Sequence, residues 1–286
     1  MAALPQPEVS MIDTIYAAIE KAEEKPNLYL ARLGASGIGD ECLRSIWLSW
    51  RAYDDKKFGG RMLRLFRTGH LQEDRILDDL KLAGYQVWDR DEKGNQPTFN
   101  DDTGHFVAKL DGVIKGVPGA EKTAHDLEIK THSLKNFENV KKKGVQVSMP
   151  GHYWQMQAGM LFSGLPRALY VALCKNDEDY HIERIRPDAD VQNEIQRKII
   201  KLVEARTPPV GISPDQKAFG CRWCDMKEVC AGDKEPIRTC RSCTYAVVIP
   251  EGGRWGCEHH SGPKSGQELT QDAQRSACLC YERIES

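Results

Sequence analysis

The pattern of apolar and polar positions divides the chain into helical and strand segments. Apolar residues at helical spacing predict helices over about 9–24, 41–54, 59–84, 133–143, 151–164 and 188–206. Short apolar or alternating runs bounded by Gly, Asn, Asp and Pro predict strands in YQVWD, GHFVAKLDGVI, HDLEIKT, RALYVALCKN and DYHIERI. Asp40 is the expected N-cap of the second helix, and Asp188 or Asp190 that of the last. This order predicts an α/β core with a mixed sheet flanked by helices.

The last fifty residues differ in composition from the rest. From about residue 236 the chain is rich in Cys and Gly, and such a short segment does not form a core without a cross-link or a metal. We therefore expect three parts: an N-terminal helical arm at 1–36, a core domain at 37–235 and a small Cys-rich module at 236–286.

Composition excludes several classes of protein. Of the 286 residues 40% are apolar and 29% are charged, and the net charge is −2, which argues against disorder and against a globally basic nucleic-acid binder. No apolar run is long enough to span a membrane, and MAALPQPEVS is not a signal peptide, so we expect a cytoplasmic protein. In a reducing compartment the ten cysteines favour metal sites over disulfides.

Polar residues alternate along the segment HDLEIKTH. Asp126, Glu128 and Lys130 share one face of the predicted strand, and Asp111 precedes them at the end of another strand. This face is either solvated or a site for a metal ion and a proton donor. Carboxylates suit a hard cation such as Mg²⁺, and a lysine beside them can activate water and stabilise charge on a phosphate.

Asp111 and the run Glu128-Ile129-Lys130 resemble the signature of the PD-(D/E)XK nuclease superfamily, with Leu110 in place of its proline. The resemblance implies a restriction-endonuclease-like core, with Mg²⁺ or Mn²⁺ held by the two carboxylates and Lys130 assisting the nucleophile. Glu73, in GHLQEDR, matches a helix carboxylate of RecB-type and lambda-type exonucleases, which makes it a third expected metal ligand. Asp126 has no counterpart in the signature, and we expect it near the site or on the surface.

The segment HYWQMQAGM extends the resemblance. Gln155 and Gln157 match the paired glutamines of lambda-type exonucleases, and Tyr153 matches a motif tyrosine. Gln155 is the one expected to face the site, donating to a phosphate or holding the lysine. The resemblance thus implies a catalytic set that appears in family order along the chain: Glu73, Asp111, Glu128, Lys130 and Gln155.

The first cysteine set is CRWCDMKEVC, which contains Cys221, Cys224 and Cys230. Three thiolates leave a tetrahedral or cubane site incomplete, and Cys42 is the expected fourth ligand. One cysteine before the core and three after it resemble the iron–sulfur nucleases, which include CRISPR-associated adaptation nucleases and AddAB-type nuclease domains. We favour a [4Fe–4S] cluster, and a four-cysteine zinc site stays open as the alternative.

The second cysteine set lies in the C-terminal module. Cys240-x2-Cys243 followed by Cys257 and further Cys or His residues is typical of a zinc ribbon or knuckle. The fourth ligand is ambiguous between Cys278, Cys280, His259 and His260, and we favour Cys278 because it would secure the whole tail.

Local positive charge flanks the predicted site. Residues 44–75 carry eight Lys/Arg against four Asp/Glu, and residues 130–143 carry five lysines against one glutamate. These segments are able to hold DNA phosphates, although a solvated helix face explains the lysines almost as well. The expected DNA-binding residues are Arg44, Arg64, Arg67, Lys135, Lys141, Lys142, Tyr153 and Gln157.

These features predict a metal-dependent deoxyribonuclease with an iron–sulfur centre and a C-terminal zinc module. The resemblance favours an exonuclease of phage recombination or double-strand-break processing, with DNA ends or single strands as substrate, little sequence specificity and a single-strand annealing protein as a partner. Two alternatives stay open. One is a non-catalytic iron–sulfur or zinc protein that binds DNA or protein, and the other is a structure-specific endonuclease of the same fold.

Overall fold

The computed structural model describes residues 10–24, 28 and 30–284. Two of the predictions fall on residues outside them: the absence of a signal peptide, which rests on residues 1–9, and the expected helix start at Val9. None of the described helices is both long and apolar enough to cross a membrane.

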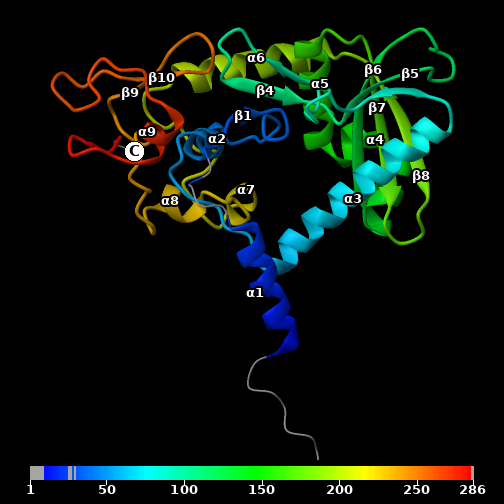
Figure 1. Cartoon of the computed structure of the whole chain (residues 1–286), viewed down its shortest axis with the longest axis horizontal. Helices are drawn as coiled ribbons and strands as arrows, with labels where there is room; N and C mark the ends of the chain where they lie inside the picture. The colour runs from blue at the N-terminus through cyan, green and yellow to red at the C-terminus, as the bar shows by residue number, and fades with distance from the viewer. Residues whose placement is uncertain (1–9, 25–27, 29, 285–286) are drawn as a thin grey trace, which may run out of the picture.

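A five-stranded sheet forms the centre of one half of the molecule (Figure 1). Its strands, in spatial order, are β2 (Gln86–Trp88), β5 (Gly112–Lys115), β6 (His125–His132), β7 (Ala168–Cys174) and β8 (Tyr180–Ile185). β6 and β7 are parallel and the other neighbouring pairs are antiparallel, so the sheet is mixed, as predicted. All seven residues of β7 are buried, which explains why its sequence is apolar throughout rather than alternating.

Helices cover both faces of this sheet. On one face α3 (Gly60–Leu82) packs its buried residues Ile76, Leu77 and Leu80 against Leu127 and Ile129 of β6. The other face is covered by α4 (Leu134–Ser148) and α5 (Pro150–Ser163), which form a second cluster with alternate residues of β7. β6 therefore lies between two layers of helices, and most of its residues are buried.

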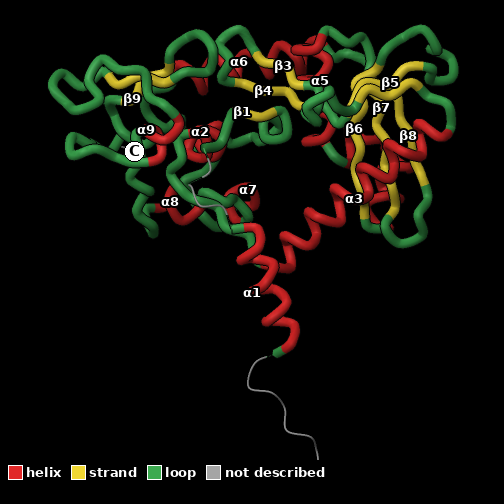
Figure 2. The backbone as a smooth tube through the Cα atoms, in the orientation of Figure 1, coloured by secondary structure: helices red, strands yellow, loops and turns green. Residues whose placement is uncertain are grey.

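The other half of the molecule combines short strands, helices and the C-terminal segment (Figure 2). Its elements are β1 (Leu33–Gly34), α2 (Leu43–Trp50), β3 (Thr98–Asn100), β4 (Phe106–Lys109), α6 (Ala189–Glu204), α7 (Phe219–Arg222), α8 (Lys227–Ala231), β9 (Ala246–Val248), β10 (Trp255–Cys257) and α9 (Gln271–Arg275). The N-terminal helix α1 (Met11–Glu23) packs against α3. β1, β4 and β3 form a three-stranded sheet, and β9 pairs with β10. Trp255 of β10 is buried in one apolar cluster with Trp47 and Trp50 of α2, so the C-terminal segment packs directly on the core domain.

Two predicted elements differ from the structure. The second helix spans Leu43–Trp50 rather than 41–54, and Cys42 rather than Asp40 is its N-cap residue. The Asp40 carboxylate instead accepts a hydrogen bond from the Cys42 amide at 2.9 Å, and the helix ends before Ala52, whose φ of 54° is left-handed. The run GHFVAKLDGVI forms two strands, β4 and β5, because the chain passes from one sheet to the other at Leu110 and Asp111.

Candidate active site

The alternation along β6 places Glu128 and Lys130 on the face that is covered by α5. Leu127 and Ile129 point to the opposite face and pack under α3, as the strand period predicts. Glu128 is 1% exposed and Asp126 is 1% exposed, so this is not the solvated strand face that the sequence left open. Two buried carboxylates side by side on one strand require charge compensation or protonation.

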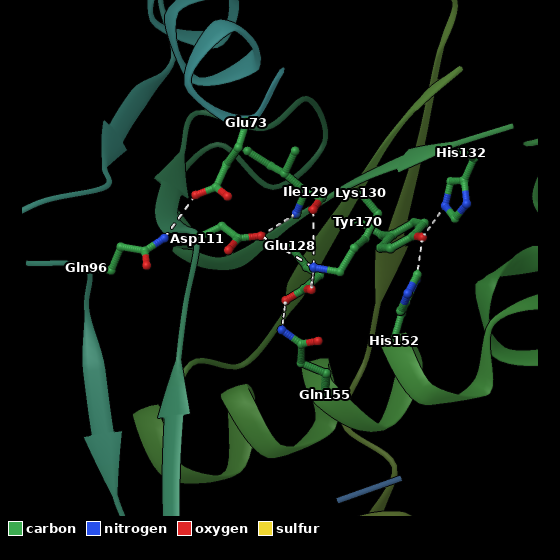
Figure 3. A network of polar contacts seen from close by, with 10 residues as sticks. All are labelled: Glu73, Gln96, Asp111, Glu128, Ile129, Lys130, His132, His152, Gln155 and Tyr170. Carbon is green, nitrogen blue, oxygen red and sulfur yellow. Dashed lines mark hydrogen bonds and ion pairs between the residues drawn. The ribbon is translucent and has the colours of Figure 1, made fainter. Parts of the chain in front are cut away.

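Lys130 is the centre of a polar network that joins four elements (Figure 3). Its ammonium group forms an ion pair with Glu128 and lies 3.8 Å from the carboxylate of Asp111. Asp111 also accepts a hydrogen bond from the Ile129 amide at 2.8 Å, which ties the start of β5 to the middle of β6. The Gln155 amide of α5 donates to the second oxygen of Glu128 at 2.9 Å. Gln155 was expected to hold the lysine or a phosphate, and in the structure it holds the glutamate.

Glu73 enters the same region from α3. Its carboxylate accepts a hydrogen bond from the Gln96 side chain at 3.0 Å (Figure 3). Burial and then the nearby negative charge of Asp111 raise the pKa of Glu73, while Lys130 opposes the shift. The structure therefore brings Glu73, Asp111, Glu128, Lys130 and Gln155 together, although they span more than 80 residues of sequence.

The electrostatics of the site reflect an excess of carboxylates in a buried place. Burial raises the pKa of Glu128 to about 7; Asp111 and Glu73 add to the shift and Lys130 opposes it. Burial alone would favour the neutral amine of Lys130, but its ion pairs with Glu128 and Asp111 raise its pKa above the usual range. The lysine is thus a fixed cation, and Glu128 titrates near neutrality.

These side chains fit a divalent cation by their chemistry. Carboxylate oxygens are the ligands that Mg²⁺ and Mn²⁺ prefer, and a cation would lower the raised pKa values of Glu73 and Glu128. Among the described residues, no three His, Cys, Asp or Glu side chains are arranged so that they could hold a metal ion directly. At the centre of this site the ammonium group of Lys130 lies between Glu128 and Asp111. A divalent cation here would therefore compete with Lys130 for the same oxygens.

Asp126 lies at the closed end of the site. Neither of its carboxyl oxygens has a hydrogen-bond partner within the described parts of the chain, and its side chain packs against Gly159 of α5. Burial, followed by the charges of Glu128 and Asp111, raises the pKa of Asp126 well above its usual value. Asp126 is therefore a buried carboxyl group whose environment favours the neutral form, and it does not lie on the surface.

A chain of three aromatic side chains adjoins the site and was not predicted. The Tyr170 hydroxyl lies 2.7 Å from Nε2 of His132 and 2.8 Å from Nδ1 of His152 (Figure 3). Burial lowers the pKa of both histidines, that of His152 to about 3, and the positive charge of Lys130 acts in the same direction. The period of β6 places His132 on the same face as Lys130, and His152 lies one helical turn before Gln155. These two spacings were the features of the sequence from which the positions of His132 and His152 beside the site could have been predicted.

The residues expected to bind DNA fall into two groups. Arg64, Arg67, Lys135, Lys141 and Lys142 are exposed, and their role stays a prediction. Tyr153, Gln157 and Arg44 form the second group, because each makes hydrogen bonds within the protein.

Gln157 is fully buried and joins α5 to the start of α6. Its amide nitrogen donates to the Arg186 carbonyl and its oxygen accepts from the Asp188 amide, each at 2.9 Å. Tyr153 is 8% exposed and donates from its hydroxyl to Asp188 at 3.1 Å. Arg44 donates to the sulfur of Cys230 at 3.2 Å and to the Pro209 carbonyl at 3.3 Å. Gln157 and Tyr153 are buried and hydrogen-bonded, so they cannot contact DNA without local unfolding. Arg44 is only half-buried, and its role in DNA binding stays a prediction.

The structure brings the first cysteine set together. Cys42, Cys221, Cys224 and Cys230 line one pocket of about 160 Å³. Partial burial and the three neighbouring thiols raise the pKa of Cys221, which agrees with their closeness. Cys174, by contrast, is fully buried in the cluster beneath α4 and α5 and is a core thiol.

The second cysteine set also converges. Cys240, Cys243, Cys257, Cys278 and Cys280 line a space of only about 10 Å³, together with His259. The Lys264 ammonium group donates to the sulfur of Cys240 at 3.2 Å. The choice between Cys278 and Cys280 as fourth ligand stays open, because both side chains face this space, and His259 is there as well.

No family model matches the chain, and no curated protein matches it. Similar solved structures include the alkaline exonuclease LHK-Exo from Laribacter hongkongensis, at 19% identity and a TM-score of 0.45, with 66% of this chain and 91% of that chain covered. LHK-Exo in complex with dAMP gives 18% identity and a TM-score of 0.46, with 66% and 89% covered. The structure of SSO0001 gives 10% identity and a TM-score of 0.41, with 78% and 98% covered. At these identities and TM-scores we base the function on the residues of the site.

Proposed function

We propose that this chain is a metal-dependent deoxyribonuclease that hydrolyses phosphodiester bonds. The observation that carries the proposal is the meeting of Asp111, Glu128 and Lys130 at one buried point, with Glu73 and Gln155 beside them. A purely structural ion pair would need one carboxylate for one lysine. Here an excess of carboxylates with raised pKa values surrounds one ammonium group, as in sites that are built to receive further positive charge.

Each residue has a role that follows from its contacts. Asp111, Glu128 and Glu73 are the residues that would hold Mg²⁺ or Mn²⁺. The bound cation would supply Lewis-acid stabilisation of the phosphate and activation of water. Gln155 fixes one oxygen of Glu128, so the rotamer of this carboxylate is set before substrate binds. Lys130 remains protonated and stabilises negative charge on the attacking oxygen or the phosphate.

The decisive experiment is degradation of end-labelled linear DNA with Mn²⁺, using wild type and Lys130→Ala. Loss of the fixed cation is expected to lower the rate by a factor of about 10² or more. Lys93→Ala is the matched control, because Lys93 is exposed and lies in a turn outside the site. Unchanged activity in Lys130→Ala, at equal iron, sulfide and zinc content, would exclude the mechanism. Absence of degradation by the wild type with its metal centres intact would favour a non-catalytic binding protein.

We propose an exonuclease that acts on DNA ends, in phage recombination or break processing in the cytoplasm, with a single-strand annealing protein as partner. Closed circular DNA separates this form from its alternative. An exonuclease leaves the circle intact and degrades the same DNA after linearisation, whereas a structure-specific endonuclease cuts the circle.

The two cysteine sets are proposed to bind different metal centres. The pocket of about 160 Å³ between Cys42 and the triplet of Cys221, Cys224 and Cys230 suits a polynuclear [4Fe–4S] cluster. The space of about 10 Å³ in the second set suits a single Zn²⁺ ion, since it is too small for a polynuclear cluster. The expected result is that Cys224→Ser lowers iron and acid-labile sulfide with zinc retained. Cys243→Ser is the reciprocal control, and zinc loss from both variants would contradict the assignment.

A further inference from the structure

A large pocket lies at the junction between the C-terminal segment and the core domain, and we call it the junction pocket. Its volume is about 650 Å³, and its walls come from the turn before β4, the turn between β9 and β10, and α9. Small-molecule sites commonly have volumes of roughly 300–1,000 Å³. The candidate active site contributes no residue to the described lining, and β9, β10 and α9 lie at the other end of the molecule from the five-stranded sheet (Figure 1).

The lining of the junction pocket is positively charged. Arg32, Arg241 and Arg275 line it, and none of its described lining residues is an aspartate or glutamate. Arg32 is held by the Asn100 side chain at 3.0 Å and the Gly104 carbonyl at 3.2 Å, both of them neutral groups. Arg275 pairs with Asp272, whose side chain is 91% exposed, so solvent screens much of that interaction. Arg32 and Arg275 therefore give the described lining a positive charge that attracts anions.

The polar groups in its depth are held in place. Arg241 is 7% exposed, donates to the Gln274 side chain at 2.9 Å and to the Trp50 carbonyl at 3.0 Å, and lies over the Trp255 ring at 4.9 Å. Gln274 is itself 5% exposed and donates to the Leu269 carbonyl at 2.8 Å. A donor that is fixed in this way loses little entropy when it binds a ligand.

The two turns that form another wall are also fixed. A side chain on Gly104 would place its Cβ 2.5 Å from the Gly253 nitrogen, and the Gly253 amide donates to the Thr103 carbonyl at 2.8 Å. Only glycine permits the two backbones to approach this closely, and the contact holds the core domain against the C-terminal segment beside the pocket. The junction pocket is thus a preformed site rather than a loose gap between two parts.

We propose that the junction pocket binds a phosphate group carried by a nucleotide. Guanidinium groups match phosphate geometry and stay charged at every relevant pH, and three of them suit a dianion better than a single carboxylate. The apolar side chains of Leu28 and Leu30, also in the lining, provide a surface for the sugar and base. The phosphate can belong to a DNA strand or to a free nucleoside monophosphate, and both present the same chemistry. The C-terminal segment would then contribute a ligand site as well as its metal centre.

The test measures binding to the full chain with its metal centres intact and without added divalent cations, so that no DNA is degraded. The probes are a 5′-phosphorylated single-stranded oligonucleotide of 12 nucleotides, dAMP, and deoxyadenosine as the uncharged match. Arg275→Gln removes one guanidinium group. Gln271→Glu places a negative charge at the exposed rim without removing a buried contact. Gln267→Glu is the control, because it makes the same change on the same segment outside the pocket.

The expected result is a dissociation constant that rises about tenfold or more in Arg275→Gln and Gln271→Glu, with Gln267→Glu unchanged and deoxyadenosine binding weakly throughout. If a DNA strand is the source, the oligonucleotide shows the loss, and the salt dependence of its binding falls by roughly 0.7 per lost phosphate contact. If a free nucleotide is the source of the phosphate, only dAMP binds more weakly to the two pocket variants. Equal binding of both probes to wild type and to both pocket variants would overturn the proposal. Such a result would leave the nuclease mechanism standing, because the active site is unchanged.

Discussion

Replacement of Lys130 by methionine tests how the charge of this lysine affects stability and cation binding, separately from its role in DNA cleavage. The change keeps the length of the side chain but removes the cation that faces Glu128 and Asp111. At the 3.8 Å distance between Nζ and the Asp111 oxygen, the Coulomb attraction is about 4 kcal/mol at an effective dielectric constant of about 20. Removing one partner of a buried ion pair costs about 3–5 kcal/mol, so we expect the free energy of unfolding to fall by about 3 kcal/mol.

The loss of stability in Lys130→Met should grow as the pH rises. Glu128 has a folded pKa of about 7, above its unfolded value of 4.5, so its contribution to stability is present below pH 4.5 and is lost as the pH rises through 7. In Lys130→Met the lowering influence of the ammonium group is gone, and ionisation of Glu128 becomes more costly still. Urea unfolding should therefore show a small difference from wild type at pH 5 and a large one at pH 8.

The same variant should bind Mn²⁺ more tightly. Both carboxylates are released from the ammonium group, and the repulsion between two cations is removed. We expect the dissociation constant for Mn²⁺ to fall about tenfold or more in isothermal titration calorimetry, which corresponds to about 1.4 kcal/mol. Mn²⁺ should also restore much of the lost stability, while DNA cleavage stays low. Lys93→Met is the control for an exposed lysine. Unchanged or weaker Mn²⁺ binding, together with unchanged stability at pH 8, would refute the competition between Lys130 and the cation.

Three further predictions concern groups packed around the site. Because the pKa of Asp126 is raised, the protein loses stability as the pH rises above the unfolded value of 3.8. Asp126→Asn should therefore flatten the pH dependence of the free energy of unfolding between pH 5 and 8, by up to about 1.4 kcal/mol per pH unit. Parallel plots of this free energy against pH for the two proteins, from urea unfolding, would contradict this. A Cβ on Gly159 would lie 2.0 Å from the Asp126 carboxyl oxygen, so Gly159→Ala should lower the free energy of unfolding in urea by about 1–3 kcal/mol. The loss should be smaller in an Asp126→Ala background. Gly151→Ala is the control and should cost nothing, because a Cβ there meets no atom within 4 Å. His152 has a folded pKa of about 3 and an unfolded pKa of 6.5, so its neutral form stabilises the fold above pH 6.5, and this effect is lost as the pH falls toward 3. The thermal midpoint of His152→Gln should therefore decline less than that of the wild type on acidification from pH 7 to 4.

The sequence predicted the helices and strands that carry the site because their patterns are local. Strand period alone places Glu128 and Lys130 on one face and Leu127 and Ile129 on the other, and this holds in the structure. The mixed sheet flanked by helices also follows from the order of segments. Local patterns could not show that β6 lies between two helical layers, because the burial of a polar strand depends on elements that are distant in sequence.

On α5 the resemblance pointed to Gln155 as the residue that faces the site, and this agrees with the structure, whereas Gln157 and Tyr153, expected to bind DNA, are buried. Gln155 and Gln157 stand two residues apart, and periodicity along a helix that is apolar on most sides does not indicate which one faces the site. In the structure the rotation of α5 points Gln155 at Glu128 and Gln157 at the start of α6. Arg44 was assigned by net charge, but its neighbour is a cysteine almost 190 residues later.

By itself, then, the sequence determined which residues can share a strand face, which residue types could hold a cation, and which cysteines stand in metal-ligand spacing. Tertiary structure decided what these residues meet. It placed the Lys130 ammonium group between two carboxylates, raised the pKa of Asp126 by burying it, and brought Arg32 to the same pocket as Arg241 and Arg275. The physical reason is that periodicity acts over a few residues, whereas desolvation and electrostatic interaction depend on distance in space.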